Sequence, residues 1–190
     1  MLLHLRRSLL LSAVFLVLLG IAYPLAGTGL SLGLFRSQAE GSLVSLHGRV
    51  VGSSLIGQSW PGPRWFQGRP DGALLTGKPG QVQVSGAQQW GPRSKALRNF
   101  VISQAERLKA EGIIPTNDLV TNSGSLVDPD ISPADAYDQV VAVARADHLA
   151  PARVSALVAS HVQGRQFGFL GAPYVDVLQL NVALARLEHR

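Results

Sequence analysis

The sequence predicts a mixed α/β domain attached to a membrane by one N-terminal helix. Two observations support this class: no charged residue occurs between Arg7 and Arg36, and the rest of the chain divides into a Gly/Pro/Ser-rich part and a helical part. A helix of about 20 residues crosses a hydrocarbon core of about 30 Å. We therefore expect residues 1–7 to form a cytoplasmic tail, residues 8–30 a transmembrane helix, and residues 31–190 an extracytoplasmic α/β domain.

A cleaved export signal is the alternative interpretation of the apolar segment, because Arg6 and Arg7 precede it. The uncharged stretch is long for such a signal, and its best cleavage site, residues 26–28, matches the small-residue pattern poorly. We expect a retained anchor. Pro24 should then lie where the helix is ending, so that its missing N–H has little effect.

Flanking charge predicts the orientation of this anchor. Arg6 and Arg7 flank its N-terminal end, whereas residues 26–35 carry no charge. The positive-inside rule then places the N-terminus in the cytoplasm and the domain outside the cell membrane. Small residues permit close approach of helices in a membrane. We expect partner helices to contact the anchor at Ser12, Ala13, Phe15 and Gly20.

The charge of the chain is polarised rather than uniformly basic. Residues 36–109 carry ten basic and three acidic side chains, and residues 110–147 carry seven acidic side chains and Arg145. Without a Lys/Arg run or a nucleic-acid motif, this distribution argues against nucleic-acid binding. The absence of cysteine excludes disulfides and thiolate metal sites.

Four amphipathic helices are predicted in the second half of the chain. Their apolar spacing and Ser, Pro or Asp start signals favour helices over residues 94–111, from Ser132, from Pro151 and from Asp176. The helix after Ser132 should bury Tyr137, Val140, Val141 and Ala144. Short apolar runs predict strands at residues 54–56, 64–66, 82–84, 118–121 and 174–175, and residues 37–56 should connect membrane and domain.

No cofactor fingerprint or metal-ligand set is present, so the chain alone lacks the usual equipment for catalysis. The enzymatic alternative is a membrane-tethered serine hydrolase that uses Ser123 or Ser125 with His161 and Asp128, which would have to meet within hydrogen-bond distance. His161 lies on the apolar stripe of its predicted helix, so we expect a buried core histidine instead. The acidic stretch between Asp118 and Asp138 indicates a diffuse negative field rather than a metal site.

Motifs spread along the chain closely resemble one family. They include Leu55-Ile56-Gly57-Gln58, Trp65-Phe66 with Gly68-Arg69-Pro70, Ser123-Gly124-Ser125, Asp128-Pro129, Gly168-Phe169-Leu170-Gly171 and Leu180-Asn181. In this order they resemble the C subunit of bacterial Kdp potassium-transporting ATPases. The match runs from the anchor to the last helix.

The resemblance implies an accessory subunit of a high-affinity K⁺ import pump. Its implied partners are a channel-like subunit that handles K⁺, a P-type ATPase subunit that hydrolyses ATP, and a small single-span subunit. The family is credited with stabilising the complex and with raising the ATP affinity of the ATPase subunit as a catalytic chaperone. This subunit itself would be non-catalytic.

Residues 84–89 loosely resemble the Ser-Gly-Gly-Gln signature with which ABC transporters contact nucleotide. By this resemblance only, Ser85, Gly86 and Gln88 are the candidates for contact with ATP, although a loop explains the composition equally well. ATP is cytoplasmic, whereas the predicted orientation places these residues outside. We therefore expect any influence on the ATPase to pass through the anchor.

The segment Thr121 to Ser132 is too polar for a core, and we expect it to face a partner or the K⁺ entrance. The residues predicted to form this edge are Thr121, Ser123, Gly124, Ser125, Asp128 and Asp130.

Overall fold

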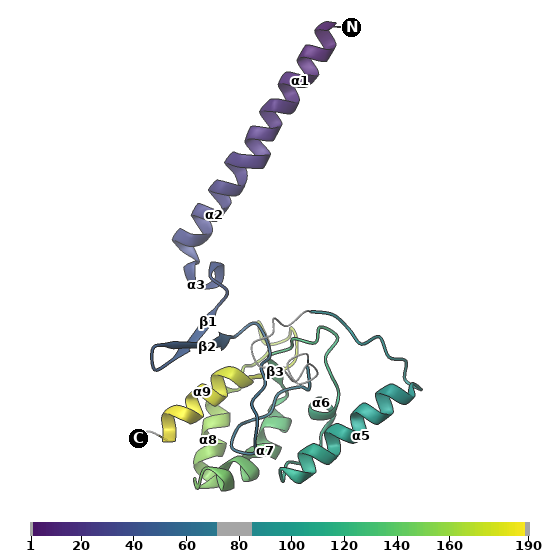
Figure 1. Ribbon diagram of the computed structural model, residues 1–190. Helices are drawn as coiled ribbons and strands as arrows, with labels where there is room; N and C mark the ends of the chain where they lie inside the picture. Colours follow the sequence, from purple (N-terminus) through teal and green to yellow (C-terminus); the bar gives the residue numbers. More distant parts are fainter. Residues whose placement is uncertain (1, 72–84, 189–190) are drawn as a thin grey trace. The chain divides into compact units, whose positions relative to one another are not determined.

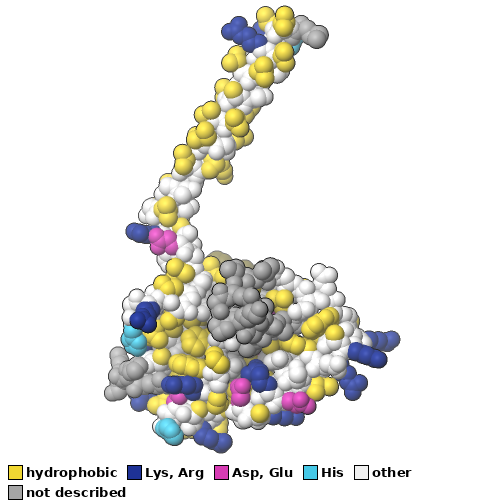
Figure 2. Space-filling model, in the orientation of Figure 1, with side chains coloured by type: hydrophobic (Ala, Val, Ile, Leu, Met, Phe, Trp, Pro, Cys, Tyr) yellow, Lys and Arg dark blue, Asp and Glu magenta, His cyan; other side chains and the backbone are white. Residues whose placement is uncertain are grey.

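The computed structural model describes residues 2–71 and 85–188. The chain forms two compact units, residues 1–43 and 44–190. In the first unit, α1 (Leu2–Val17), η1 (Leu18–Ala22) and α2 (Tyr23–Leu34) form one continuous helix, followed by the short α3 (Arg36–Ala39) (Figure 1). The 33-residue helix is apolar and long enough to cross a membrane, and Figure 2 shows hydrophobic side chains along its length.

Pro24 lies inside this helix and not at its end, so the prediction for Pro24 is wrong. Proline cannot donate a hydrogen bond to the carbonyl four residues earlier, here that of Gly20. The preceding turn, η1, is a π-helix in which the Tyr23 N–H donates to the Leu18 carbonyl, five residues back. The wider turn accommodates the proline, and the helix continues to Leu34.

The second unit begins at a hairpin of β1 (Leu43–Leu46) and β2 (Arg49–Ser53). Its two-residue turn has φ of 49° at His47 and 77° at Gly48, as a type I′ turn requires. The predicted connection over residues 37–56 is thus structured. The predicted strands at residues 54–56 and 64–66 are irregular segments, and neither run pairs with another strand among the described residues. The predicted strand at residues 82–84 lies outside the described residues.

All four predicted helices are present: α5 (Lys95–Ala110), α7 (Pro133–Ala146), α8 (Pro151–His161) and α9 (Val177–Glu188). Ser132 Oγ caps α7 by accepting a hydrogen bond from the Asp135 N–H at 3.1 Å. The Asp176 carboxylate caps α9 by accepting from the Gln179 N–H at 2.8 Å. These caps satisfy N–H groups that have no partner within the helix, which is why the start signals located the helices well.

A strand predicted over residues 118–121 is instead the short helix α6 (Asn117–Val120). The Val120 and Thr121 N–H groups donate to the carbonyls of Thr116 and Asn117, four residues back. Leu119 and Val120 are both buried. The prediction was based on the short apolar run, and such a run does not distinguish a buried strand from a buried helical turn.

The small sheet of the domain pairs β3 (Asp130–Ile131) with β4 (Val175–Asp176) in antiparallel orientation. Asp130 lies opposite Asp176, and Ile131 lies opposite Val175. The predicted strand at residues 174–175 is therefore confirmed in part. This pairing joins the loop before α7 to the start of α9.

The core lies among α7, α8, α9 and the segments that cross them. Val140 and Ala144 of α7 are buried as predicted, but Tyr137 and Val141 are exposed. The buried face is rotated toward three other residues: Ala136, Gln139 and Val143. The apolar periodicity did not predict this rotation, because Gln139, at the centre of the buried face, is polar.

Two buried amides hold the extended segment at Phe66 and Gln67. Asn181 of α9 accepts from the Phe66 N–H and donates to the Phe66 carbonyl, both at 2.9 Å. Gln139 of α7 accepts from the Gln67 N–H at 2.7 Å and donates to the Gln67 carbonyl at 3.1 Å. The two amides replace the strand neighbours that this backbone lacks, and they fix the position of the residues that follow it, Arg69 and Asp71.

Candidate functional site

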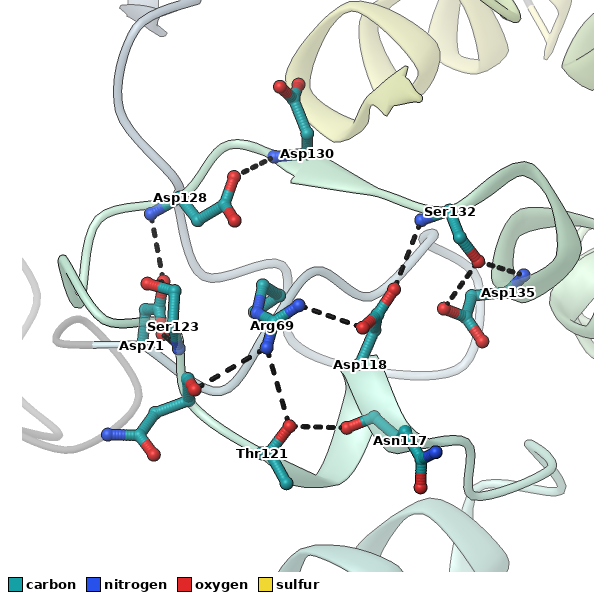
Figure 3. A network of polar contacts seen from close by, with 11 residues as sticks. Arg69, Asp71, Asn117, Asp118, Thr121, Ser123, Asp128, Asp130, Ser132 and Asp135 are labelled. Atoms are coloured by element: carbon teal, nitrogen blue, oxygen red, sulfur yellow. Dashed lines mark hydrogen bonds and ion pairs between the residues drawn. The ribbon is translucent and has the colours of Figure 1, made fainter. Parts of the chain in front are cut away.

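Arg69 lies at the centre of a polar network between α6 and the loop that follows it (Figure 3). Its Nη1 is 2.8 Å from Asp118 Oδ1, and both side chains are less than one-third exposed. Its Nη2 donates to Thr121 Oγ1 at 3.4 Å and to the Asn122 carbonyl at 3.5 Å. The Arg69 guanidinium thus connects the extended segment at Phe66 and Gln67 to Thr121 and Asn122, where the predicted partner-facing edge begins.

Asp71 organises the next part of that edge. Its carboxylate, 5 % exposed, accepts hydrogen bonds from the Ser123 N–H at 2.7 Å, from Ser123 Oγ at 2.6 Å and from the Asp128 N–H at 2.9 Å. Ser123 Oγ also lies 3.2 Å from Ser125 Oγ. Hydrogen bonds to a charged acceptor are the strong ones, so a single carboxylate holds residues 123–128 in a closed loop.

Asp118 and Asp135 form a second acidic pair around Ser132. The Ser132 N–H donates to Asp118 at 3.4 Å, and Ser132 Oγ donates to Asp135 at 2.7 Å. Burial raises the pKa of Asp118, but hydrogen bonding with Asp135 and the charge of Arg69 outweigh it and hold that pKa below its usual value. Burial and the hydrogen bond with Asp118 raise the pKa of Asp135. Of the two, Asp118 is the carboxylate that carries the negative charge opposite Arg69.

Beyond the loop lies a cavity of about 470 Å³, whose lining includes Asp130, His161, Tyr174, Asp176 and Gln179. Burial, with the charges of Asp128 and Asp176, raises the pKa of Asp130 to about 6. Burial also raises the pKa of Asp176, although the Gln179 hydrogen bonds and the charge of His161 act in the opposite direction. The cross-strand aspartates therefore repel each other at neutral pH.

The raised pKa of Asp130, which is caused first by burial and then by the neighbouring aspartates, predicts a pH-dependent stability. The raised pKa of Asp130 means that the folded state binds the proton more tightly than the unfolded state between the unfolded value of 3.8 and about 6. The free energy of unfolding therefore falls as pH rises through this window and stays low above it. At pH values above 7, Asp130→Asn should raise the free energy of unfolding by about 1 kcal/mol, a value reduced for solvent screening. Near pH 4 the same substitution should change the free energy of unfolding little.

Melting temperatures of the full chain in detergent at low and neutral pH check this prediction. Asp138→Asn, which changes an exposed aspartate of α7, is the matched control and should change the melting temperature little at either pH. An equal gain in melting temperature from Asp130→Asn at both pH values would contradict the raised pKa of Asp130.

The structure brings the six predicted edge residues into one loop and adds two residues that sequence reasoning did not assign, Arg69 and Asp71. The motif Gly68-Arg69-Pro70 contributed only to the family resemblance, and Asp71 carried no recognisable pattern. Of the nucleotide candidates, Gly86 donates its N–H to the Ser125 carbonyl at 2.9 Å. Ser85 and Gly86 are exposed and Gln88 is half-buried, so this segment lies beside the same loop.

The serine hydrolase triad is not assembled in the described residues. Ser123 Oγ donates to Asp71, whereas the His161 ring nitrogen Nδ1 contacts the Leu157 carbonyl at 2.9 Å and Ser160 Oγ at 3.1 Å. His161 is half-buried and lines the cavity. The prediction of a buried core histidine is therefore wrong, because α8 turns this last residue toward Asp176 and away from the core.

A family model and several known proteins match this chain over nearly its whole length. The family model described as "KdpC: K+-transporting ATPase, c chain" matches residues 5–186. A protein of Methylobacterium nodulans named "Potassium-transporting ATPase KdpC subunit" is 48 % identical over 198 residues, covering 98 % of each chain. Proteins with the same name from Sorangium cellulosum and Variovorax paradoxus are each 47 % identical, covering 97 % and 94 % of this chain and 98 % and 94 % of their own. With its single apolar N-terminal helix and its mixed domain, the chain belongs to the KdpC family of K⁺-transporting ATPase subunits.

Proposed function

We propose that this chain is a non-catalytic subunit that assembles and stabilises the K⁺ pump from outside the membrane. Its partners would be the channel-like K⁺ subunit, the P-type ATPase subunit and the small single-span subunit. The observation that carries the proposal is the loop of residues 121–128, which hydrogen bonds from Arg69 and to Asp71 hold at Thr121, Ser123 and Asp128. A surface that is ordered before binding loses less conformational entropy when a partner docks.

Orientation is supported by the charges that flank the anchor. Arg6 and Arg7 lie near the N-terminal end of the apolar helix, and no charged residue follows them before Arg36. Under the positive-inside rule the tail is cytoplasmic, so the loop faces the side from which K⁺ is imported.

An effect on ATP affinity would then be transmitted through the anchor. The π-turn at residues 18–22 contains Gly20, one of the small residues expected to contact partner helices. Because ATP is cytoplasmic, we propose that these helix contacts, rather than Ser85, Gly86 or Gln88, raise the ATP affinity of the ATPase subunit.

The acidic loop is proposed to favour the arrival of K⁺ at the channel-like subunit. Replacing Asp128 and Asp130 by Asn should lower K⁺ uptake severalfold at limiting K⁺ and low ionic strength, because a local negative field raises the cation concentration. The maximal ATPase rate should stay nearly unchanged. The loss should fade toward about 0.1 M salt, where the Debye length falls to about 10 Å.

Transport by the assembled pump in reconstituted vesicles tests this expectation. Asp138→Asn removes one charge from the same acidic segment but from an exposed face of α7, and it should have the smaller effect. Unchanged uptake by an intact complex with Asp128→Asn/Asp130→Asn would remove the proposed role in K⁺ arrival.

A further inference from the structure

The loop of residues 163–174 exposes large apolar side chains to solvent. Phe167 is 87 % exposed and Phe169 is 71 % exposed, with Leu170 and Tyr174 also exposed. Single exposed apolar residues are ordinary on a protein surface, whereas a group of them in one short loop indicates an interaction site.

This loop is ordered by its own backbone. Gln163 and Tyr174 exchange hydrogen bonds of 2.8 and 3.0 Å at its base, and Gln166 and Leu170 exchange bonds of 3.0 and 2.9 Å nearer its tip. Because both ends of the loop are paired, the aromatic side chains are held outside the core by the fold.

The tip also stores an unfavourable backbone conformation. Phe167 has φ of 52°, in the left-handed region that bulky side chains rarely adopt. A glycine would adopt this φ without strain, and Gly168 and Gly171 do so in the same loop, at 83° and 78°. A largely exposed phenylalanine at this position adds nothing to the core that compensates for the strain, so its benefit to the protein lies outside the domain.

The charged side chain nearest the aromatic tip in the sequence is basic. Residues 148–175 contain Arg153 and Arg165 but no aspartate or glutamate. Arg165 is exposed beside the aromatic tip. Aromatic residues and arginine are the types enriched at the energetic centres of protein interfaces.

We propose that the loop 163–174 is a docking element that inserts Phe167 and Phe169 into an apolar cleft of another pump subunit, with an acidic residue of that subunit beside Arg165. The inference rests on the proposed assembling role and names a second contact element, whose base lies beside the segment 121–132 at the cavity that Asp130 and Tyr174 both line. The loop alone is smaller than a complete stable interface, so it acts together with other contacts.

Substitution at Phe167 separates docking from folding. Phe167→Gly relieves the positive φ, so the full chain should melt at an equal or higher temperature than the unsubstituted protein. Combined with Phe169→Ser, it should lower the recovery of the other pump subunits in co-purification at least tenfold. Arg165→Glu should also lower the recovery of the other pump subunits.

The matched control is Ile102→Ser/Val141→Ser, which removes two exposed apolar side chains from α5 and α7; it should leave recovery unchanged. Full recovery with Phe167→Gly/Phe169→Ser would overturn the docking element while leaving the assembling role intact. Failure of the unsubstituted chain to co-purify with any pump subunit would instead overturn the assembling role.

A single cysteine at position 169 distinguishes a protein cleft from lipid, because the chain has no other cysteine. In the detergent-solubilised complete pump, Phe169→Cys should be protected from a thiol reagent, and in the solubilised chain alone it should react. Protection of the chain alone in lipid vesicles, without protection in the solubilised pump, would assign the loop to the bilayer and overturn the proposal.

Discussion

Asn181→Leu should lower the free energy of unfolding by about 3 kcal/mol or more. Leucine has a similar size but no polar atoms, so the Phe66 N–H and carbonyl, both bonded by Asn181 at 2.9 Å, would remain buried without these partners. Each unsatisfied buried group costs about 1–3 kcal/mol. The position is fully buried, and water cannot replace the lost hydrogen bonds without rearrangement of the core.

Urea unfolding of the full chain in detergent, followed by tryptophan fluorescence, measures this change, because Trp65 immediately precedes the clamped residue Phe66. Asn99→Leu on α5, an exposed position, should change stability by no more than about 0.5 kcal/mol. If Asn181→Leu lowers the free energy of unfolding by less than about 1 kcal/mol, the hydrogen bonds between Asn181 and the Phe66 backbone are dispensable for stability.

Asp71→Ala should release the loop of residues 123–128 and lower stability by a similar amount, about 3 kcal/mol. The substitution removes the acceptor of three hydrogen bonds at 2.6 to 2.9 Å and leaves the Ser123 and Asp128 N–H groups without it. Hydrogen bonds to a charged group contribute about 1.5–3 kcal/mol each, and relaxation of the half-exposed loop recovers part of the loss. Asp71→Asn keeps one acceptor oxygen and should give an intermediate value.

Hydrogen exchange locates the effect within the domain. The amides of Ser123 and Asp128 should lose protection in Asp71→Ala, whereas the amides of α8 should lose much less. Asp138→Ala on the exposed face of α7 is the control for removal of a carboxylate. Unchanged exchange at Ser123 and Asp128 would contradict the role assigned to Asp71.

Local signals in the sequence predicted α7 and α9 because the cap residue of each helix accepts a hydrogen bond from an N–H of its own first turn. Ser132, followed by Pro133, and Asp176 act through residues three positions away. The anchor was equally predictable, since length and hydropathy alone define a possible span.

Contacts between distant segments were not predictable in the same way. Gln139 and Asn181 reach backbone 72 and 115 residues away, and a polar side chain on a helix gives no sign of such a partner. Asp71 likewise bonds residues more than 50 positions later. The composition of residues 121–132 therefore predicted a polar segment outside the core, but it did not reveal that Arg69 and Asp71 bond this segment.

A cysteine at position 125 tests the central claim most directly. Ser125 is exposed in the loop, and Ser125→Cys would be the only thiol in the chain. A membrane-impermeant thiol reagent applied from outside to cells with a permeable outer envelope should label the chain expressed alone and should label it much less in the assembled pump. Labelling only after the cytoplasmic membrane is permeabilised would contradict the external location, and equal labelling with and without the other subunits would contradict the partner-facing role.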